Sequence, residues 1–319
     1  MKLVYILIAS VLLFSCRKEE RPVAPNQPGE VTMNTATMTA DYRYQLYFNL
    51  ENNEFVGQNI KTDWDLAFTT GVEDFVIKTN AANAMSVADL GEVDFASVTD
   101  TLGFAANESY DAVTGNLDST AIGDWRNKEN LYLINKGFSY TGQHRGYAKL
   151  KLIDYTSSSY TFRLGALSDP EGTVYKVDKK INYNFSFFSI DESSTVTVEP
   201  PKEDWDLVFT QYTHIFYEPF TPYLVTGTLL NQHETKALLI EDLPFAEVEL
   251  EDVTNLLLSD HLNTIGYDWK TFTDGNYTIH SDKTYIIQDQ KGLYYKLRFI
   301  DFYDENGQRG APKFEFQAL

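Results

Sequence analysis

The chain has 319 residues, of which 43% are hydrophobic and 14% aromatic, and its formal net charge is −20 at pH 7. This apolar content is far too high for a disordered chain, so most of the sequence is expected to fold around a core. The excess of negative charge repels nucleic-acid phosphates, which excludes DNA or RNA as a partner.

The first 15 residues have the pattern of a lipoprotein signal peptide. Lys2 provides a positive start, and residues 3–13 form an apolar run. Such a run is too short to cross a bilayer, which takes roughly 20 residues, and it fits the hydrophobic region of a signal peptide. It leads into Leu-Phe-Ser-Cys at residues 13–16, which resembles a lipobox. Cys16, the one cysteine of the chain, is therefore predicted to be lipidated and to start the mature protein.

Residues 16–38 are expected to be a lipidated, Pro-rich tether. Residues 17–20 (Arg-Lys-Glu-Glu) resemble the surface-export signal of Bacteroidota lipoproteins. The residues that break helix and sheet in this segment are Pro22, Pro25, Pro28 and Gly29. The sequence thus predicts a protein that is anchored by lipid in the outer membrane and exposed at the cell surface.

An internal repeat divides the rest of the chain. Three motifs recur in the same order, at residues 63–69 and 204–210, 122–125 and 265–269, and 147–155 and 294–302. The spacing between the copies drifts only from 141 to 147 residues, and all four tryptophans fall within these motifs. A period of this length suits two domains, which we expect at residues 39–170 and 171–319.

Each copy is expected to be rich in antiparallel strands. Apolar and polar side chains alternate through residues 42–50, which is the period of a half-buried strand. Trp64 and its counterpart Trp205 share a strand face with Leu and Phe side chains, so both are expected in the core. Helical spacing is persuasive only at residues 250–257. The fold class is therefore mainly β with few short helices, and each copy carries enough strands to fold alone.

The sequence gives no sign of catalysis. Motifs of zinc proteases, serine hydrolases and nucleotide-binding proteins are absent, and so is any cysteine beyond Cys16. The paired aspartates next to each Trp motif, Asp63 with Asp65 and Asp204 with Asp206, are expected to have a structural role. We therefore expect a binding protein and not an enzyme.

The order of these motifs resembles a known family. An aromatic strand is followed by Trp-Asp-Leu-Ala-Phe within residues 63–69, by a strand ending in Ile-Lys-Thr-Asn at 77–80, and by a late hairpin at 147–155. This order resembles the HmuY family, lipoproteins of Bacteroidota whose best-known members capture haem at the cell surface. The resemblance covers nearly all of residues 40–319 as two tandem copies. It implies two HmuY-like antiparallel β domains, haem as the ligand for iron acquisition, and an outer-membrane receptor as a partner.

Haem iron is usually held by His or Met side chains. Four of the five histidines lie in the second copy, between its Trp motif and its closing hairpin. His261 and His280 are the first choice of axial ligands, and His233 is the reserve. In the first copy Met85 is the candidate, whereas His144 is expected at an exposed hairpin tip.

A second function remains open on the same residues. Tyr and Trp side chains stack on sugars as readily as on a porphyrin, and an acidic surface tolerates neutral sugars better than haem propionates. The alternative is therefore a surface lipoprotein that binds a glycan or another non-haem ligand, with a structural or scaffolding role.

Overall fold

The computed structural model describes residues 29–319, so the expected signal peptide, Cys16 and the first part of the tether lie outside the described residues. Within this range the chain forms 21 strands but only two short α-helices, α1 (Phe104–Asn107) and α2 (Leu250–Val253). The strands pair antiparallel, which confirms the mainly β fold class. No helix in this range is long and apolar enough to cross a membrane.

The helix expected through residue 257 is shorter than its apolar spacing suggested. α2 ends at Val253, and Leu257 is exposed to solvent. Thr254 and Asn255 have low helix propensity, so they interrupt the helix where its apolar pattern would continue.

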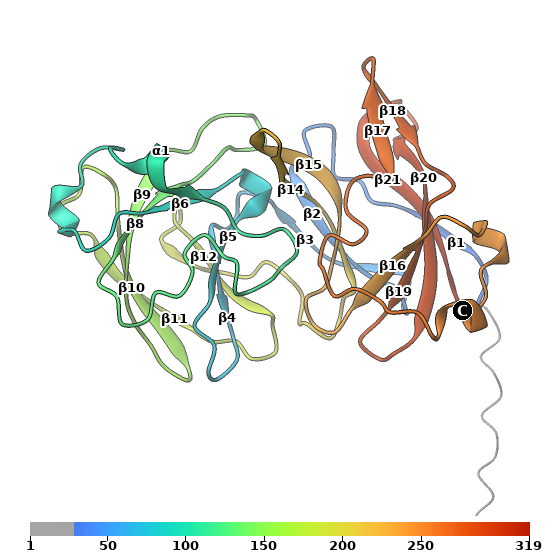
Figure 1. Ribbon diagram of the computed structural model, residues 1–319, viewed down its shortest axis with the longest axis horizontal. Helices are drawn as coiled ribbons and strands as arrows, with labels where there is room; N and C mark the ends of the chain where they lie inside the picture. Colours follow the sequence, from blue (N-terminus) through green and yellow to red (C-terminus); the bar gives the residue numbers. More distant parts are fainter. Residues whose placement is uncertain (1–28) are drawn as a thin grey trace, which may run out of the picture.

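The first lobe consists of two packed sheets, on the left of Figure 1. Its six-stranded sheet has the order β11 (Thr173–Asp178), β10 (Ser159–Gly165), β9 (Tyr147–Tyr155), β8 (Leu131–Asn135), β6 (Ser86–Asp89) and β7 (Glu108–Ser109). Its four-stranded sheet has the order β13 (Ser194–Val196), β12 (Phe185–Ser189), β4 (Leu66–Thr69) and β5 (Ile77–Thr79). The core between them is aliphatic and aromatic, because each strand turns one alternating face inward.

The second lobe repeats this plan. Its five-stranded sheet has the order β1 (Thr32–Thr35), β21 (Arg309–Ala318), β20 (Tyr294–Tyr303), β19 (Thr284–Gln288) and β16 (Lys236–Ile240). Its four-stranded sheet has the order β15 (Phe220–Leu230), β14 (Leu207–Tyr217), β2 (Tyr44–Asn49) and β3 (Glu54–Ile60). A separate hairpin, β17 (Lys270–Thr273) and β18 (Asn276–Ile279), projects at the top of Figure 1.

The two lobes do not coincide with the two copies of the sequence. Strands β2 and β3 of the first copy, together with β1 just before it, lie in the second lobe, and strands β11–β13 of the second copy lie in the first lobe. We call residues 29–60 the N-terminal arm and residues 173–198 the second arm. The structure therefore differs from the expectation that each copy keeps its own aromatic strand. The boundaries 39–170 and 171–319 stay a prediction about the repeat in sequence.

The N-terminal arm begins earlier than the expected tether ends. Residues 29–38 lie on the folded body, where β1 pairs with β21 and the side chains of Ala36 and Met38 are buried. The breaking residues all precede residue 30, whereas Thr, Val and Met, which tolerate strands, follow it.

The tryptophans of the two repeated motifs differ in burial. Trp205 is buried, as expected, in a small cluster between the two four-stranded sheets. Trp64 packs against the same cluster but is only half-buried, and its indole N–H donates a hydrogen bond to Gln45 Oε1 at 2.9 Å.

Candidate functional site

A groove lined by aromatic side chains opens on the second lobe, between the tips of two hairpins. We call it the aromatic groove, and its volume is about 500 Å³. This volume lies in the range of roughly 300–1,000 Å³ that small-molecule and cofactor sites occupy. Its aromatic lining residues are Tyr42, Phe216, Tyr223, Tyr267, Phe272 and Tyr277.

The long hairpin β14–β15 forms one wall of the aromatic groove. The two strands pair along their whole length, from Leu207 with Leu230 to Tyr217 with Phe220. β2 pairs only with residues 207–209, so the outer part of the hairpin extends beyond its neighbour (Figure 1). Its exposed aromatic side chains therefore have no strand beside them to cover them.

Two cations lie in the groove. The Lys270 ammonium is buried, lies 3.9 Å from the centroid of the Trp269 ring, and donates to the Thr226 carbonyl. Burial lowers the pKa of Lys270 to about 7. The Arg309 guanidinium lies 5.4 Å from the ring centroid of Tyr42, which the N-terminal arm contributes. The aromatic walls can cover a flat apolar ring system, and Arg309 can pair with an acidic substituent on it.

Two histidines border the groove. His280, a predicted axial ligand, follows β18, and its Nε2 lies 2.7 Å from Oγ1 of the lining residue Thr271. His214, on β14, packs its ring against Phe216 and Tyr267, with centroids 4.7 and 5.1 Å apart. Nδ1 of His214 is buried and has no hydrogen-bond partner among the residues that the structure describes. Burial lowers the pKa of His214, which keeps the ring neutral and able to bind a metal.

None of the predicted ligands is itself a lining residue of the aromatic groove, and only His280 contacts one, Thr271. His261 is exposed in a turn, and His233 is half-buried in the turn after β15. Met85 is 1% exposed and packs in the core of the first lobe. His144 is exposed, as expected, and its Nε2 lies 2.9 Å from Asn135 Oδ1.

Sequence reasoning missed His214. The signal that could have found it is the run His-Ile-Phe-Tyr at residues 214–217, followed by Phe220 and Tyr223. Exposed aromatic residues on both strands of one hairpin indicate a surface that a ligand or partner covers.

A second cavity lies between the two four-stranded sheets, and we call it the central cavity. Its volume is about 130 Å³, and its lining includes Trp64, Trp205 and three ionisable residues, Lys78, Asp111 and Glu199. This volume is below the usual range for cofactor sites. The Glu199 carboxylate accepts a hydrogen bond from the Phe185 N–H at 3.0 Å, and burial raises its pKa to about 7.

The Glu199 pKa predicts that replacing Glu199 with Gln stabilises the protein at pH 8 but not near pH 4.5. The folded state holds the proton up to about pH 7, whereas the unfolded carboxyl loses it near pH 4.5. The contribution of Glu199 to the free energy of unfolding is therefore most favourable below pH 4.5. It falls by roughly 3 kcal/mol as the pH rises through 7, because the folded state must then bury an ionised carboxylate. Urea unfolding of both proteins across this range measures it. A difference between them that does not change with pH would contradict the assignment.

The comparisons with known proteins agree with the motif order. A family model described as HmuY protein matches residues 41–136 and 223–316, which together are more than half of the chain. None of the curated proteins matches the chain. Among residues 29–319 no group of three or more His, Cys, Asp or Glu side chains is arranged to hold a metal ion.

Three solved structures are similar over most of their length. Apo PinO from Porphyromonas gingivitis is 10% identical, covers 91% of this chain and 97% of its own, and has a TM-score of 0.34. A Bacteroides vulgatus protein described as HmuY_like is 13% identical, with 90% of each chain covered and a TM-score of 0.24. The apo HmuY analog of Tannerella forsythia is 12% identical, covers 92% of this chain and 99% of its own, and has a TM-score of 0.25. All three TM-scores are below 0.5, so the relationship to known proteins rests on the two matches to the family model and not on these structures.

Proposed function

The chain belongs to the HmuY family, as two tandem copies, and from this membership we propose that it binds haem in the aromatic groove of its second lobe. It is a binding protein that is held by a lipid on Cys16 at the outer-membrane surface. It takes up haem there for iron acquisition and passes it to an outer-membrane receptor.

One observation carries the proposal: two histidines border the same groove that aromatic side chains line. A neutral imidazole can coordinate haem iron, and aromatic rings can cover the porphyrin. His280 and His214 meet the first need, and the six aromatic lining residues meet the second. The Arg309 guanidinium, which lines the groove, can pair with a propionate.

Of the predicted axial ligands, the proposal keeps His280 and adds His214. The Thr271 hydroxyl now occupies Nε2 of His280, so haem binding requires that this hydrogen bond opens. His261, His233 and Met85 remain predicted ligands that the same experiment tests.

We expect the chain without residues 1–16 to give a saturable Soret band when it is titrated with haem. His280→Ala and His214→Ala should each shift the band and weaken binding about tenfold or more, because each removes a ligand or its positioning. His144→Ala is the matched control, since it also removes a histidine beside aromatic rings and should change nothing. Binding should weaken below about pH 6, because protons compete with iron for imidazole.

The other outcomes separate the alternatives. A band that responds to His261→Ala, His233→Ala or Met85→Leu, and not to His280→Ala or His214→Ala, would move the site away from the groove. If the wild-type chain shows no saturable change with ferric or ferrous haem, the haem proposal is wrong. The glycan-binding alternative would then lead, because the exposed rings of Tyr223 and Phe272 are suited to stack on sugars.

A further inference from the structure

The two arms dock in equivalent ways on opposite lobes. In the first lobe, β12 of the second arm pairs with β4, with Phe187 opposite Ala67. In the second lobe, β2 of the N-terminal arm pairs with β14, with Tyr47 opposite Val208. β4 and β14 are the strands that follow the two Trp-Asp motifs. Each lobe thus uses its Trp-Asp strand as the edge that accepts an arm, as in strand addition to a sheet.

The aspartate of each motif binds the tip of the arm. Oδ2 of Asp65 accepts a hydrogen bond from the Ile190 N–H at 2.7 Å, and Oδ2 of Asp206 accepts one from the Leu50 N–H at 2.8 Å. Asp65 and Asp206 are both buried. The expected structural role of these two aspartates is therefore confirmed, and the structure shows that it is to hold an arm.

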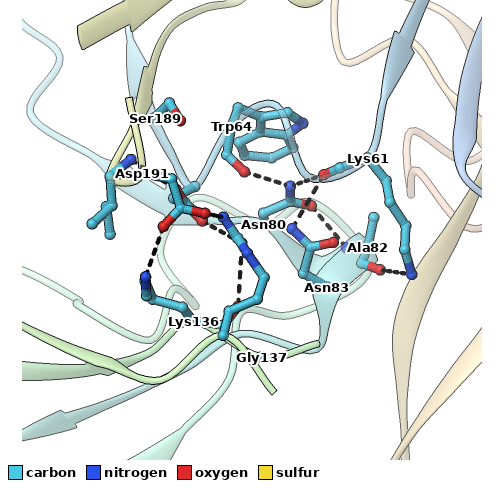
Figure 2. Close-up of polar contacts among 12 residues, drawn as sticks. Lys61, Trp64, Asn80, Ala82, Asn83, Lys136, Gly137, Ser189 and Asp191 are labelled. Atoms are coloured by element: carbon cyan, nitrogen blue, oxygen red, sulfur yellow. Dashed lines mark hydrogen bonds and ion pairs between the residues drawn. The ribbon is translucent and has the colours of Figure 1, made fainter. Parts of the chain in front are cut away.

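The tip of each arm also carries an acidic residue that pairs with a lysine of the lobe. Asp191 pairs with Lys136 at 2.7 Å in the first lobe, and Glu51 pairs with Lys291 in the second (Figure 2 shows the first pair). The aromatic contacts repeat as well. The Trp64 and Phe187 rings lie 5.0 Å apart, and so do the Trp205 and Tyr47 rings.

The segment that leaves the N-terminal arm is fixed to the first lobe. Asn80 Nδ2 donates to the carbonyls of Lys61 and Trp64 at 2.7 and 2.8 Å, as Figure 2 shows. Asn231 does the same with the carbonyls of Lys202 and Trp205, where the chain leaves the second arm. We call residues 61–64 and 199–205, where the chain passes from one lobe to the other, the crossings. Each crossing is fixed by an Asn side chain of the lobe that it enters. The arm before it belongs to the other lobe.

Because of where the crossings lie, the first lobe is formed by one continuous segment of the chain and the second lobe by two. All strands of the first lobe, β4–β13, lie within one continuous segment, residues 61–198. The second lobe needs two segments, the N-terminal arm and residues 199–319. The arm that completes it also brings Tyr42 to the groove.

We infer that the folding units of the chain are the lobes and not the sequence copies. Residues 61–198 form one unit. Residues 199–319 present on β14 and β21 a docking surface whose occupant is the N-terminal arm, and they form the second unit only with that arm docked. The second copy, residues 171–319, which the repeat predicts to fold alone, carries the arm of the first lobe and lacks the arm of the second.

Native-state hydrogen exchange on the whole chain without residues 1–16 tests this inference. Asp206→Asn should speed amide exchange about tenfold or more in residues 29–60 and 199–319, because it weakens the hydrogen bond that holds the N-terminal arm, and should leave residues 61–198 unchanged. Asp65→Asn is the reciprocal variant. It should speed exchange in residues 61–198, including the second arm, and leave the N-terminal arm protected.

The opposite pattern would overturn the inference. If Asp206→Asn exposes residues 185–196 and leaves residues 44–60 protected, each copy keeps its own arm. If both variants expose all residues equally, the chain is one unit. Should either variant fail to fold, exchange of the wild-type chain in rising denaturant decides. The N-terminal arm must then open together with β14 and β21, and not with β4 and β5.

Discussion

Replacing Arg145 with Met is expected to lower the free energy of unfolding by about 3–5 kcal/mol, because it leaves a buried charge without its partner. The Arg145 side chain is only 7% exposed, and its Nη1 lies 2.6 Å from Oδ1 of Asp65, which is fully buried. Nη2 pairs with Asp191, at the tip of the second arm, at 2.7 Å. The substitution removes both contacts, so it should also loosen the docking of that arm. Urea unfolding at pH 7 measures the loss.

Lys176→Met is the matched control for Arg145. Lys176 pairs with Asp178 at 3.6 Å, but both side chains are largely exposed, so its loss should leave the urea midpoint unchanged. Equal effects of the two substitutions would show that the Arg145 pair does not hold the lobe together.

Replacing Trp205 with Ala is expected to cost about 3–5 kcal/mol of stability, as for other buried aromatic side chains. The Trp205 side chain is 4% exposed, and its ring contacts Tyr47 of the N-terminal arm edge-on. The new space would enlarge the central cavity between the two four-stranded sheets. Thermal and urea unfolding measure the change.

Trp64→Ala provides the comparison within the repeat. Trp64 is half-buried, so its removal should cost less than the removal of Trp205. If Trp205→Ala leaves stability unchanged but alters ligand binding, the Trp205 side chain belongs to a binding site and not to the core.

The fold class and the repeat could be predicted from sequence because they depend on local patterns. Alternating side chains specify strands, and the Trp-Asp motifs recur with nearly constant spacing. Which lobe an arm joins could not be predicted in this way. β2 and β12 have similar aromatic patterns, and β4 and β14 both follow a Trp-Asp motif, so only the three-dimensional path of residues 61–64 and 199–205 decides the pairing.

The candidate site could be predicted only in part. His280 borders the aromatic groove because β18, which it follows, pairs with β17 and brings it to Thr271, but the sequence contained no reason to prefer it to His261. His214 lies inside the long strand β14, where a histidine cannot be distinguished by sequence from any other polar residue of an alternating pattern. Met85 lies in the core because the strand after it packs on the sheet that contains β4. This contact joins segments that are separate in the sequence, so no local period reveals it. Arg145 follows His144 in the hairpin tip that was expected to be exposed, yet its side chain is buried in the lobe, where Nη1 donates to Asp65.

Anomalous diffraction at the iron edge, from crystals of the chain without residues 1–16 grown with haem, tests the proposed function most directly. We expect one iron peak in the aromatic groove, between β14–β15 and β17–β18, within coordination distance of His280 or His214. An iron peak beside His261, His233 or Met85, or a well-ordered groove with no iron in crystals that contain haem elsewhere, would contradict it.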